Sequence, residues 1–314
     1  MIDVIIPTHV KDIETLELCI EGVKRSVIGL NKIYVVSKDK LTDNAEWIPE
    51  SAFPFSLTEV SDIIGETWRT TWYYQQVLKF YAHEACEELL DNYMTVDSDT
   101  IFLRPIDFIN KENNSVYMNY NICENYQAYF EHMFKLVPGL NKFDEKSGVT
   151  HSMVFSRDVL DDLKKTVELN HGQPLWYAFL DITNHHYHTL RDQSHAAGGR
   201  ASEFEIYFNY IRRFFPDKVK IRKLSCILAY KGNLYHVEKG VHSRTNSSPS
   251  YNVFDVPDSS EFTNLEESFR YVMRKAKDEG YDSVTFQKHT RQDFQHYKSD
   301  SITYLKETLN DQDK

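Results

Sequence analysis

The chain opens with hydrophobic residues whose spacing soon changes, and this pattern predicts alternating strands and helices. Residues 2–7 are apolar except for one aspartate, which predicts a buried strand near the start of the chain. Over 13–27, apolar residues recur at steps of three and four, as on the buried face of a helix. Residues 33–36 then form a second apolar run. A strand, a helix and a strand at this spacing predict a βαβ unit with two parallel strands.

The same two periodicities predict the remaining elements. Helices are expected over 68–90, 159–167, 202–211 and 265–276, and strands over 93–96, 116–120, 153–155, 221–230 and 234–241. Ser156 and Ser202 are of a residue type that caps helix N-termini, and Gly280 is of the type that ends a helix. Together these elements predict an α/β fold with a mixed, mainly parallel sheet flanked by helices.

Polar stretches indicate where the domain ends. Residues 190–201 contain two adjacent glycines and are expected to form a loop. Residues 246–257 are rich in Ser, Asn and Pro, as in a linker or a lid. We therefore expect one domain over 1–245. Residues 246–314 are expected to form a linker and a helical C-terminal extension that packs on this core.

Charge and hydropathy narrow the classes of partner. The net charge of −11 makes a basic face for nucleic acid unexpected, but an acidic protein binds a nucleotide diphosphate when a divalent cation lies between carboxylates and phosphates. No apolar run reaches the roughly 18 residues of a membrane span, and the opening run is too short for a signal peptide. The four cysteines form no C-x-x-C pair. We expect a cytoplasmic protein with reduced thiols and no integral membrane segment.

The candidate chemistry begins with two aspartates that directly follow a predicted strand. Asp97 and Asp99 are one residue apart, and open α/β sheets bind ligands at the carboxyl ends of their strands. Carboxylate oxygens suit Mg²⁺ or Mn²⁺, and such a cation neutralises the charge that develops on a sugar diphosphate leaving group. Aspartates also end strands without binding anything, so a structural turn is the alternative interpretation.

Two segments resemble a known group of enzymes. Residues 96–105, VDSDTIFLRP, look like the D-x-D segment of GT-A glycosyltransferases, and the opening strand that ends in Ile-Pro-Thr at 6–8 fits the start of a GT-A domain. Residues 72–79, WYYQQVLK, resemble the W-x-x-Q-Q-x-x-K helix of DUF6492-type proteins, which are uncharacterised glycosyltransferase-like proteins of bacteria and large DNA viruses. The resemblance covers about 2–243. It implies a GT-A (Rossmann-like) fold and a hexosyl- or pentosyltransferase that uses a nucleotide sugar.

The resemblance also implies roles for single residues. Asp97 would meet the ribose or a metal-bound water, and Asp99 would bind Mn²⁺ or Mg²⁺ directly. A histidine near the end of the core serves as a further metal ligand in several GT-A families, and here it would be His242 or else His236. The expected site for a UDP- or GDP-sugar comprises Pro7, Thr8, Lys38, Gln75, Gln76, Lys79, Asp97 and Ser98. The expected acceptor is a glycan.

The lysine of the 72–79 motif also has a physical interpretation of its own. Gln76 and Lys79 lie one helical turn apart and can face the same cleft, where Lys79 can reach a phosphate. A solvated lysine and an amide that caps a loop are the alternative.

Two glutamates are candidates for the catalytic base. An inverting transferase needs a carboxylate that takes the proton of the acceptor hydroxyl, and Glu203 and Glu205 begin a predicted helix after a loop. Inverting GT-A enzymes commonly carry the base there. Ser202 and Glu205 also have the spacing of a capping box, which favours Glu203 as the base with Glu205 second. The chain lacks the usual Glu-Asp pair, so retention of configuration stays open.

Other features have two interpretations each. His185, His186 and His188 invite a metal site, but a polar loop is the preferred interpretation. Trp176 and Tyr177 suit either the core or an acceptor platform, and residues 148–152 can contact the donor sugar or the acceptor.

Two further functions stay open as alternatives. One is a non-catalytic carbohydrate-binding or scaffold protein on a transferase fold. The other is a phosphatase of the haloacid dehalogenase (HAD) type, whose D-x-D-x-T or D-x-D-x-V motif is not matched at Ile101.

Overall fold

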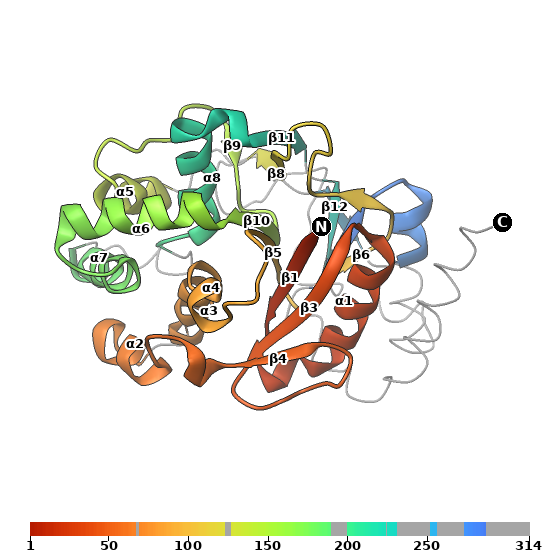
Figure 1. Cartoon of the computed structure of the whole chain (residues 1–314), viewed down its shortest axis with the longest axis horizontal. Coiled ribbons are helices and arrows are strands. Elements are labelled where there is room, and N and C mark those ends of the chain that lie inside the picture. Colours follow the sequence, from red (N-terminus) through yellow and green to blue (C-terminus); the bar gives the residue numbers. More distant parts are fainter. Residues whose placement is uncertain are drawn as a thin grey trace.

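The chain forms a mixed α/β structure around a five-stranded sheet (Figure 1). The computed structural model describes residues 1–66, 69–122, 127–189, 200–223, 225–230, 252–255 and 273–286. In sheet order the central strands are β10 (Ser152–Ser156), β5 (Asn92–Val96), β1 (Ile2–Pro7), β3 (Leu30–Ser37) and β4 (Glu46–Pro49). Strand β1 runs parallel to β3 and β5, β3 runs parallel to β4, and β10 runs antiparallel to β5. The predicted mixed, mainly parallel sheet is confirmed.

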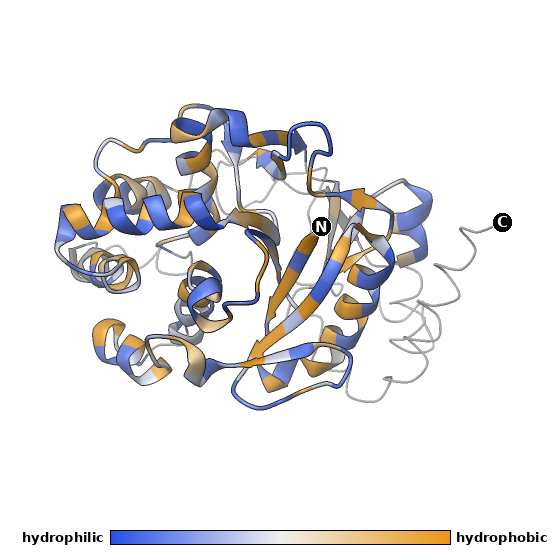
Figure 2. Cartoon of the chain, viewed as in Figure 1, coloured by the Kyte–Doolittle hydropathy of each residue, from blue (hydrophilic) through white to orange (hydrophobic). Residues whose placement is uncertain are grey.

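The buried first strand and the helix after it follow from the hydrophobic pattern. Strand β1 is buried at all six residues, as expected for a parallel strand that is covered on both faces. Helix α1 (Ile13–Ser26) buries Leu16, Ile20 and Val23, and the chain then enters β3 through the short β2 (Val27–Ile28). Figure 2 shows β1 as hydrophobic, whereas α6 (Arg157–His171) alternates between hydrophobic and hydrophilic residues. The predicted βαβ unit is therefore confirmed.

Helices gather on the side of the sheet that lies away from α1 (Figure 1). They are α2 (Leu57–Ile64), α3 (Thr70–Phe80), α4 (Ala82–Ala85), α5 (Gln127–Leu136), α6 (Arg157–His171), α7 (Leu175–Thr189) and α8 (Glu203–Phe214). Short 3-10 turns lie at Val10–Asp12, Glu50–Ala52 and Pro216–Lys218. No helix in these described segments is both long enough and apolar enough to cross a membrane.

One predicted helix is interrupted, and one predicted loop is helical. The single helix expected over 68–90 is interrupted at Tyr81, whose backbone leaves helical geometry and whose ring packs edge-on against Phe55 at 5.2 Å. The chain leaves the helix at Cys86, whose backbone is extended, so apolar periodicity alone does not determine where the helix ends. The polar loop expected at 185–188 is instead part of the backbone of α7.

The two predicted N-caps have different outcomes. The side chain of Ser202 accepts a hydrogen bond from Glu205 N, as predicted for the start of α8. Ser156 occupies the N-cap position of α6, but its hydroxyl donates to Asn92 Oδ1 at 2.6 Å and caps nothing.

The single strand predicted over 221–230 is two strands in different sheets. Strand β11 (Val219–Lys223) runs parallel to β8 (Val116–Ile122), which also pairs with β9 (Lys146–Ser147). Strand β12 (Cys226–Tyr230) joins another sheet, so the break after Lys223 separates two apolar runs that look continuous in the sequence. The strand expected over 234–241 lies outside the described residues, as does most of the 190–201 loop.

Residues beyond 246 contribute strands as well as a helix. Strands β13 (Asn252–Asp255) and β14 (Ser283–Phe286) lie on either side of β12, and β14 pairs with β6 (Thr100–Phe102). Part of the expected linker over 246–257 is therefore a strand. The helix over 273–278 ends at Gly280 with φ +87°, as predicted, in a turn closed by Tyr281 N–H on Ala276 O. The boundary between domains at 245 stays a prediction.

Candidate active site

The sheet topology brings four chain segments to one edge. Strands β1, β3 and β5 are parallel, so Thr8, Lys38 and Asp97, which follow them, lie at the same edge. Strand β10 is antiparallel to β5, and this places His151, which precedes β10, beside Asp97. This is the edge where open α/β sheets bind ligands.

A cavity of 310 Å³ at this edge brings together most of the residues that the sequence predicts for the site. Among the residues that line it are Pro7, Gln75, Gln76, Lys79, Asp97, Ser98, Asp99 and Glu203. These residues come from β1, α3, the turn after β5 and the start of α8. Glu205 does not line the cavity, and His236 and His242 lie outside the described residues.

A second cavity of 310 Å³ adjoins the first. Thr8 and Lys38 line this second cavity and not the first, while Pro7, Lys11 and Gln75 line both. Its walls hold the cations Lys11, Lys38 and Arg69 and the anions Asp12 and Glu50. The first cavity holds four acidic side chains, which are those of Asp12, Asp97, Asp99 and Glu203, against the two lysines Lys11 and Lys79. The two neighbouring cavities therefore differ in charge.

The larger cavity of 420 Å³ lies at the opposite edge of the sheet. It is lined by residues at the start of β5 and the end of β10, such as Asn92 and Ser156. Among the described residues, none of those predicted for the site lines it.

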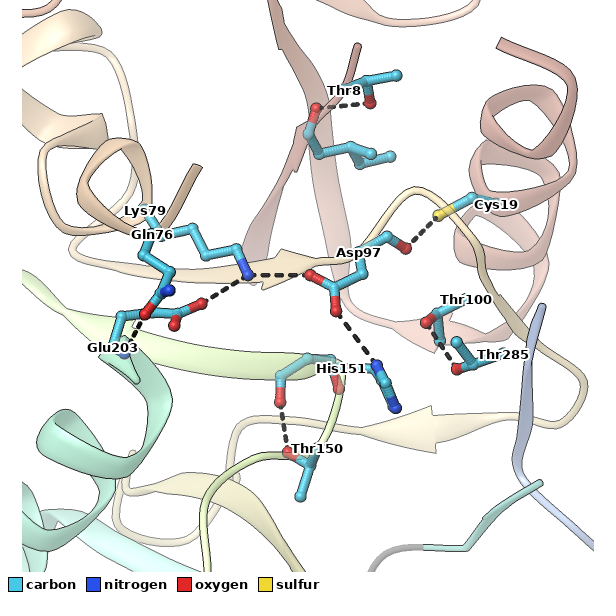
Figure 3. Close-up of polar contacts among 12 residues, drawn as sticks. Thr8, Cys19, Gln76, Lys79, Asp97, Thr100, Thr150, His151, Glu203 and Thr285 are labelled. Carbon is cyan, nitrogen blue, oxygen red and sulfur yellow. Dashed lines mark hydrogen bonds and ion pairs between the residues drawn. The ribbon is translucent and has the colours of Figure 1, made fainter. Parts of the chain in front are cut away.

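Lys79 joins the D-x-D turn to helix α8 (Figure 3). Its Nζ lies 2.9 Å from Asp97 Oδ1 and 2.7 Å from Glu203 Oε1, and it also lies 4.1 Å from the ring centroid of Phe204. Burial acts to lower the pKa of Lys79, but the two carboxylates outweigh it and raise the pKa well above its usual value. Lys79 is therefore a fixed, buried cation.

His151 holds the other oxygen of Asp97. Its Nδ1 lies 3.2 Å from Asp97 Oδ2, and its carbonyl oxygen accepts from Asp97 N at 2.9 Å. Burial acts to raise the pKa of Asp97, but Lys79 and His151 outweigh it and hold the pKa well below its usual range. The backbone of His151 has φ +61°, which is uncommon for a residue with a side chain and is typical of functional sites.

Gln76 contacts the main chain at the start of α8. Its side chain is almost fully buried, and Oε1 accepts from Glu203 N at 3.0 Å. Gln76 and Lys79, which one face of α3 presents together, therefore both contact Glu203.

Glu205 is buried outside the cavity, and its hydrogen bonds indicate a structural role. Its carboxylate accepts from Ser147 Oγ at 2.5 Å, from Gly148 N at 3.1 Å and from Asn209 Nδ2 at 3.1 Å. Burial raises the pKa of Glu205, and the hydrogen bonds from Ser147, Asn209 and Gly148 act in the opposite direction. The capping box is half formed, because the Glu205 side chain turns to Ser147 and Gly148.

The other sequence candidates divide between the cavity and the core. Val149 and His151 line the first cavity, and contact of 148–152 with the donor sugar or the acceptor stays a prediction. Trp176 packs on Phe55 at 5.2 Å and lines neither of the two adjoining cavities, which agrees with a core position.

Three residues that line the first cavity were missed in the sequence. Lys11 and Asp12 lie in the 3-10 turn after β1. Their position after the first predicted strand could have indicated that they lie at this edge of the sheet. Tyr129 comes from α5, and no local pattern in the sequence connects that helix with the D-x-D turn.

The chain matches one protein family and is similar to two solved structures. A family model described as "Family of unknown function (DUF6492)" matches residues 1–255. No curated protein matches the chain. The apo form of mouse xyloside xylosyltransferase 1 is similar in structure, with 10% identity over 74% of this chain and 88% of that one, at a TM-score of 0.38. The apo structure of the WbbM bifunctional glycosyltransferase is similar at 12% identity and a TM-score of 0.45, over 97% of this chain and 49% of that one.

Proposed function

The chain belongs to DUF6492, a family of unknown function, and we propose that it transfers a sugar from a nucleoside diphosphate sugar to a hydroxyl group of an acceptor. One observation carries the proposal. A single cavity at the carboxyl edge of the sheet holds both aspartates of the D-x-D turn, a buried lysine and a candidate base. The resemblance of residues 96–105 to the D-x-D segment of GT-A enzymes supports the same function.

The two adjoining cavities suit the two ends of such a donor. We place the nucleoside in the cavity of Thr8 and Lys38, whose cations attract the anionic diphosphate that is attached to it. The diphosphate would lie at the shared wall beside Lys11 and Gln75. The sugar would enter the first cavity, where carboxylates and amides suit its hydroxyl groups. A UDP- or GDP-sugar is the expected donor, and a glycan is the expected acceptor.

The acidic residues of the first cavity fit a cation that arrives with the donor. No group of three or more His, Cys, Asp or Glu side chains suited to a metal ion occurs within the described part of the chain. Mg²⁺, however, is often held by one or two carboxylates together with substrate phosphates. Asp99 would hold Mg²⁺ or Mn²⁺, since both oxygens of Asp97 already contact Lys79 and His151. When bound, the cation neutralises charge on the departing diphosphate.

Glu203 is the residue that we propose as the base. Its carboxylate lines the cavity and would take the proton of the acceptor hydroxyl, so the transfer would invert the configuration of the sugar. Lys79 would orient this carboxylate and, through Asp97, the D-x-D turn. Phe204 and Val149 supply apolar walls that help to exclude water from the reacting sugar.

A thermal-shift panel tests the proposal. UDP-, GDP-, CMP- and dTDP-sugars are added with and without Mn²⁺ to the wild type, to Asp99→Ala and to Asp43→Ala, a control whose carboxylate is 94% exposed. Saturation at 100 times the Kd stabilises the fold by about 2.7 kcal/mol. We expect one nucleotide class to raise Tm only with Mn²⁺, in the wild type and the control but not in Asp99→Ala. A panel without any shift contradicts the proposal.

Two further measurements separate the alternatives. Release of nucleoside diphosphate from the bound nucleotide sugar distinguishes a transferase from a non-catalytic carbohydrate-binding protein, which would bind without turnover. A phosphoryl group trapped covalently on Asp97 would instead identify a phosphatase of the HAD type.

A further inference from the structure

One face of α3 contacts Glu203 at two different points (Figure 3). Gln76 and Lys79 are three residues apart, so their side chains lie on the same face of the helix. Gln76 Oε1 accepts from the backbone N–H of Glu203 at 3.0 Å, and Lys79 Nζ lies 2.7 Å from its carboxylate. The main chain and the side chain of Glu203 are thus held from the same neighbouring helix.

The backbone contact is unusual because of its place in α8. Glu203 is the first residue of this helix, and the first four N–H groups of a helix have no partner inside it. The N-cap side chain of Ser202 accepts from Glu205 N rather than from Glu203 N. The acceptor for Glu203 N therefore comes from 127 residues earlier in the chain.

The same hydrogen bond determines how the Gln76 amide is oriented. Since Oε1 is the acceptor for Glu203 N, the other end of the amide is the donor Nε2, which is buried and has no hydrogen-bond partner among the described residues. An unpaired buried donor lowers stability. The contact between Gln76 and Glu203 is therefore made although it leaves this donor without a partner in the described part of the chain.

We propose that Gln76 is a positioning residue, which forms with Lys79 a two-point clamp on Glu203. The clamp orients the Glu203 carboxylate toward the cavity. Gln76 then acts on the reaction through Glu203, rather than by binding the nucleotide sugar as the sequence suggests. That this orientation serves proton transfer rests on the proposed function, whereas the clamp itself is tested without any ligand.

Hydrogen exchange at Glu203 tests the clamp directly. The amide of Glu203 is followed by NMR in the wild type, Gln76→Met and Gln76→Glu, because Met removes the acceptor and Glu keeps an oxygen in the same place. We expect at least tenfold protection in the wild type and in Gln76→Glu, and its loss in Gln76→Met. Exchange at the unprotected rate in the wild type, or unchanged protection in Gln76→Met, would overturn the clamp.

A double-mutant cycle tests how Gln76 acts on the reaction. The rate of nucleotide release from UDP-glucose, or from GDP-mannose if guanine nucleotides bind, is measured in Gln76→Met, Glu203→Gln and the double variant. We expect Gln76→Met to lower kcat about tenfold with KM within about twofold, and to have no further effect once Glu203 is Gln. Additive losses, or a rise in KM alone, would show that Gln76 contacts the substrate.

Ser202→Ala is the control for simple destabilisation of α8. It removes the hydrogen bond to Glu205 N at the same helix end and leaves the bond to Glu203 N in place. We expect a similar fall in Tm but a much smaller fall in kcat than in Gln76→Met. If Ser202→Ala and Gln76→Met have the same Tm and lose the same fraction of kcat, Gln76 has only a structural role. If no nucleotide sugar of the thermal-shift panel binds the wild type, the proposed function fails, while the exchange measurement still decides the clamp.

Discussion

Lys79 and Glu203, which are 124 residues apart in the chain, form an ion pair of 2.7 Å with both side chains almost fully buried. The same ammonium also contacts Asp97 at 2.9 Å. Charges attract strongly in a buried environment, but each charge also loses its hydration there. The removal of one partner therefore costs more than the pair contributes, because it leaves the other charge buried without compensation.

Lys79→Met is expected to destabilise the protein strongly. It leaves the carboxylates of Asp97 and Glu203 without their shared cation. The free energy of unfolding at pH 7 should fall by about 3 to 5 kcal/mol in urea titrations. Lys40→Met is the control, because Lys40 is half exposed in a surface pair with Asp43 and should cost less than about 1 kcal/mol. Equal losses in the two variants would contradict the buried network.

The pH dependence of the same variant has a definite sign. In the wild type, the lowered pKa of Asp97 adds stability above about pH 4, and this is lost as the pH falls. The raised pKa of Lys79 adds stability below about pH 10, which is lost as the pH rises above that value. The wild type should thus be insensitive to these groups between about pH 5 and 9. Lys79→Met should lose less stability in acid than the wild type, because Lys79 no longer lowers the pKa of Asp97, and parallel pH curves would disprove this account.

Glu203→Gln and Glu205→Gln are expected to separate chemistry from stability. Glu203 lines the cavity, so its loss should lower nucleotide release by about 100-fold or more, the effect of removing a general base. Glu205 accepts three buried hydrogen bonds, so Glu205→Gln should lower the free energy of unfolding by about 1 to 3 kcal/mol and leave turnover per folded molecule nearly intact. Urea titration and kinetics on the same samples measure both quantities.

Glu205 also has a pH signature opposite to that of Asp97. Burial raises its pKa in the fold, so the folded state prefers the neutral acid and stability falls as the pH rises above about 4.3, the pKa of an unfolded glutamate. Glu205→Gln should remove this fall. A variant that keeps the same slope would show that the carboxylate titrates as it does in the unfolded chain.

The sequence predicts the parts of this site that depend on local pattern. Strand β5 is an apolar run, and Asp97 and Asp99 directly follow it, so their place at the sheet edge could be predicted. The partners of Lys79 could not be predicted, because they depend on how α3 and α8 pack. His151 was missed as a partner of Asp97 for a similar reason, since its place depends on β10 running antiparallel to β5.

Errors in the elements arise where tertiary contacts decide the outcome. Apolar periodicity continues past Tyr81, yet the helix is interrupted there, at a residue whose ring packs against Phe55. The run over 221–230 looks like one strand, yet its halves pair with β8 and with strands from beyond residue 246. Hydrophobicity shows that such residues are buried, but it does not show which neighbour buries them.

Thr100 and Thr285 are expected to be energetically coupled. Their hydroxyl groups lie 2.8 Å apart between β6 and β14, and Phe286 N also donates to Asp99 O, so β14 is tied to the D-x-D turn. Thr100→Val or Thr285→Val should each cost about 1 to 3 kcal/mol, because each leaves one buried hydroxyl without this partner. The double variant should cost less than the sum of the two. Strict additivity in urea titrations would show that the hydroxyl pair is not formed.

Gly148→Ala is expected to change the position of Glu203, the candidate base, without altering that residue itself. A Cβ at this position would lie 2.4 Å from Phe208 Cβ and 2.7 Å from Phe204 O, so α8 must shift to admit it. Overpacking of this kind costs about 1 to 3 kcal/mol. Because Phe204 follows Glu203, the shift should also pull the Glu203 amide away from Gln76 Oε1, which lowers both nucleotide release and the exchange protection of that amide.

Gly172→Ala is the matched control for this substitution. Gly172 ends α6 with φ +64°, and no described residue has an atom within 4 Å of an added Cβ, so Ala there should cost about 1 kcal/mol through backbone strain alone. Tm, nucleotide release and amide exchange are measured for both variants. Gly172→Ala should lower only Tm, since its strain is local to the end of α6. If Gly148→Ala also lowers Tm while the Glu203 amide stays protected, the contact between Gly148 and α8 does not control the position of the base.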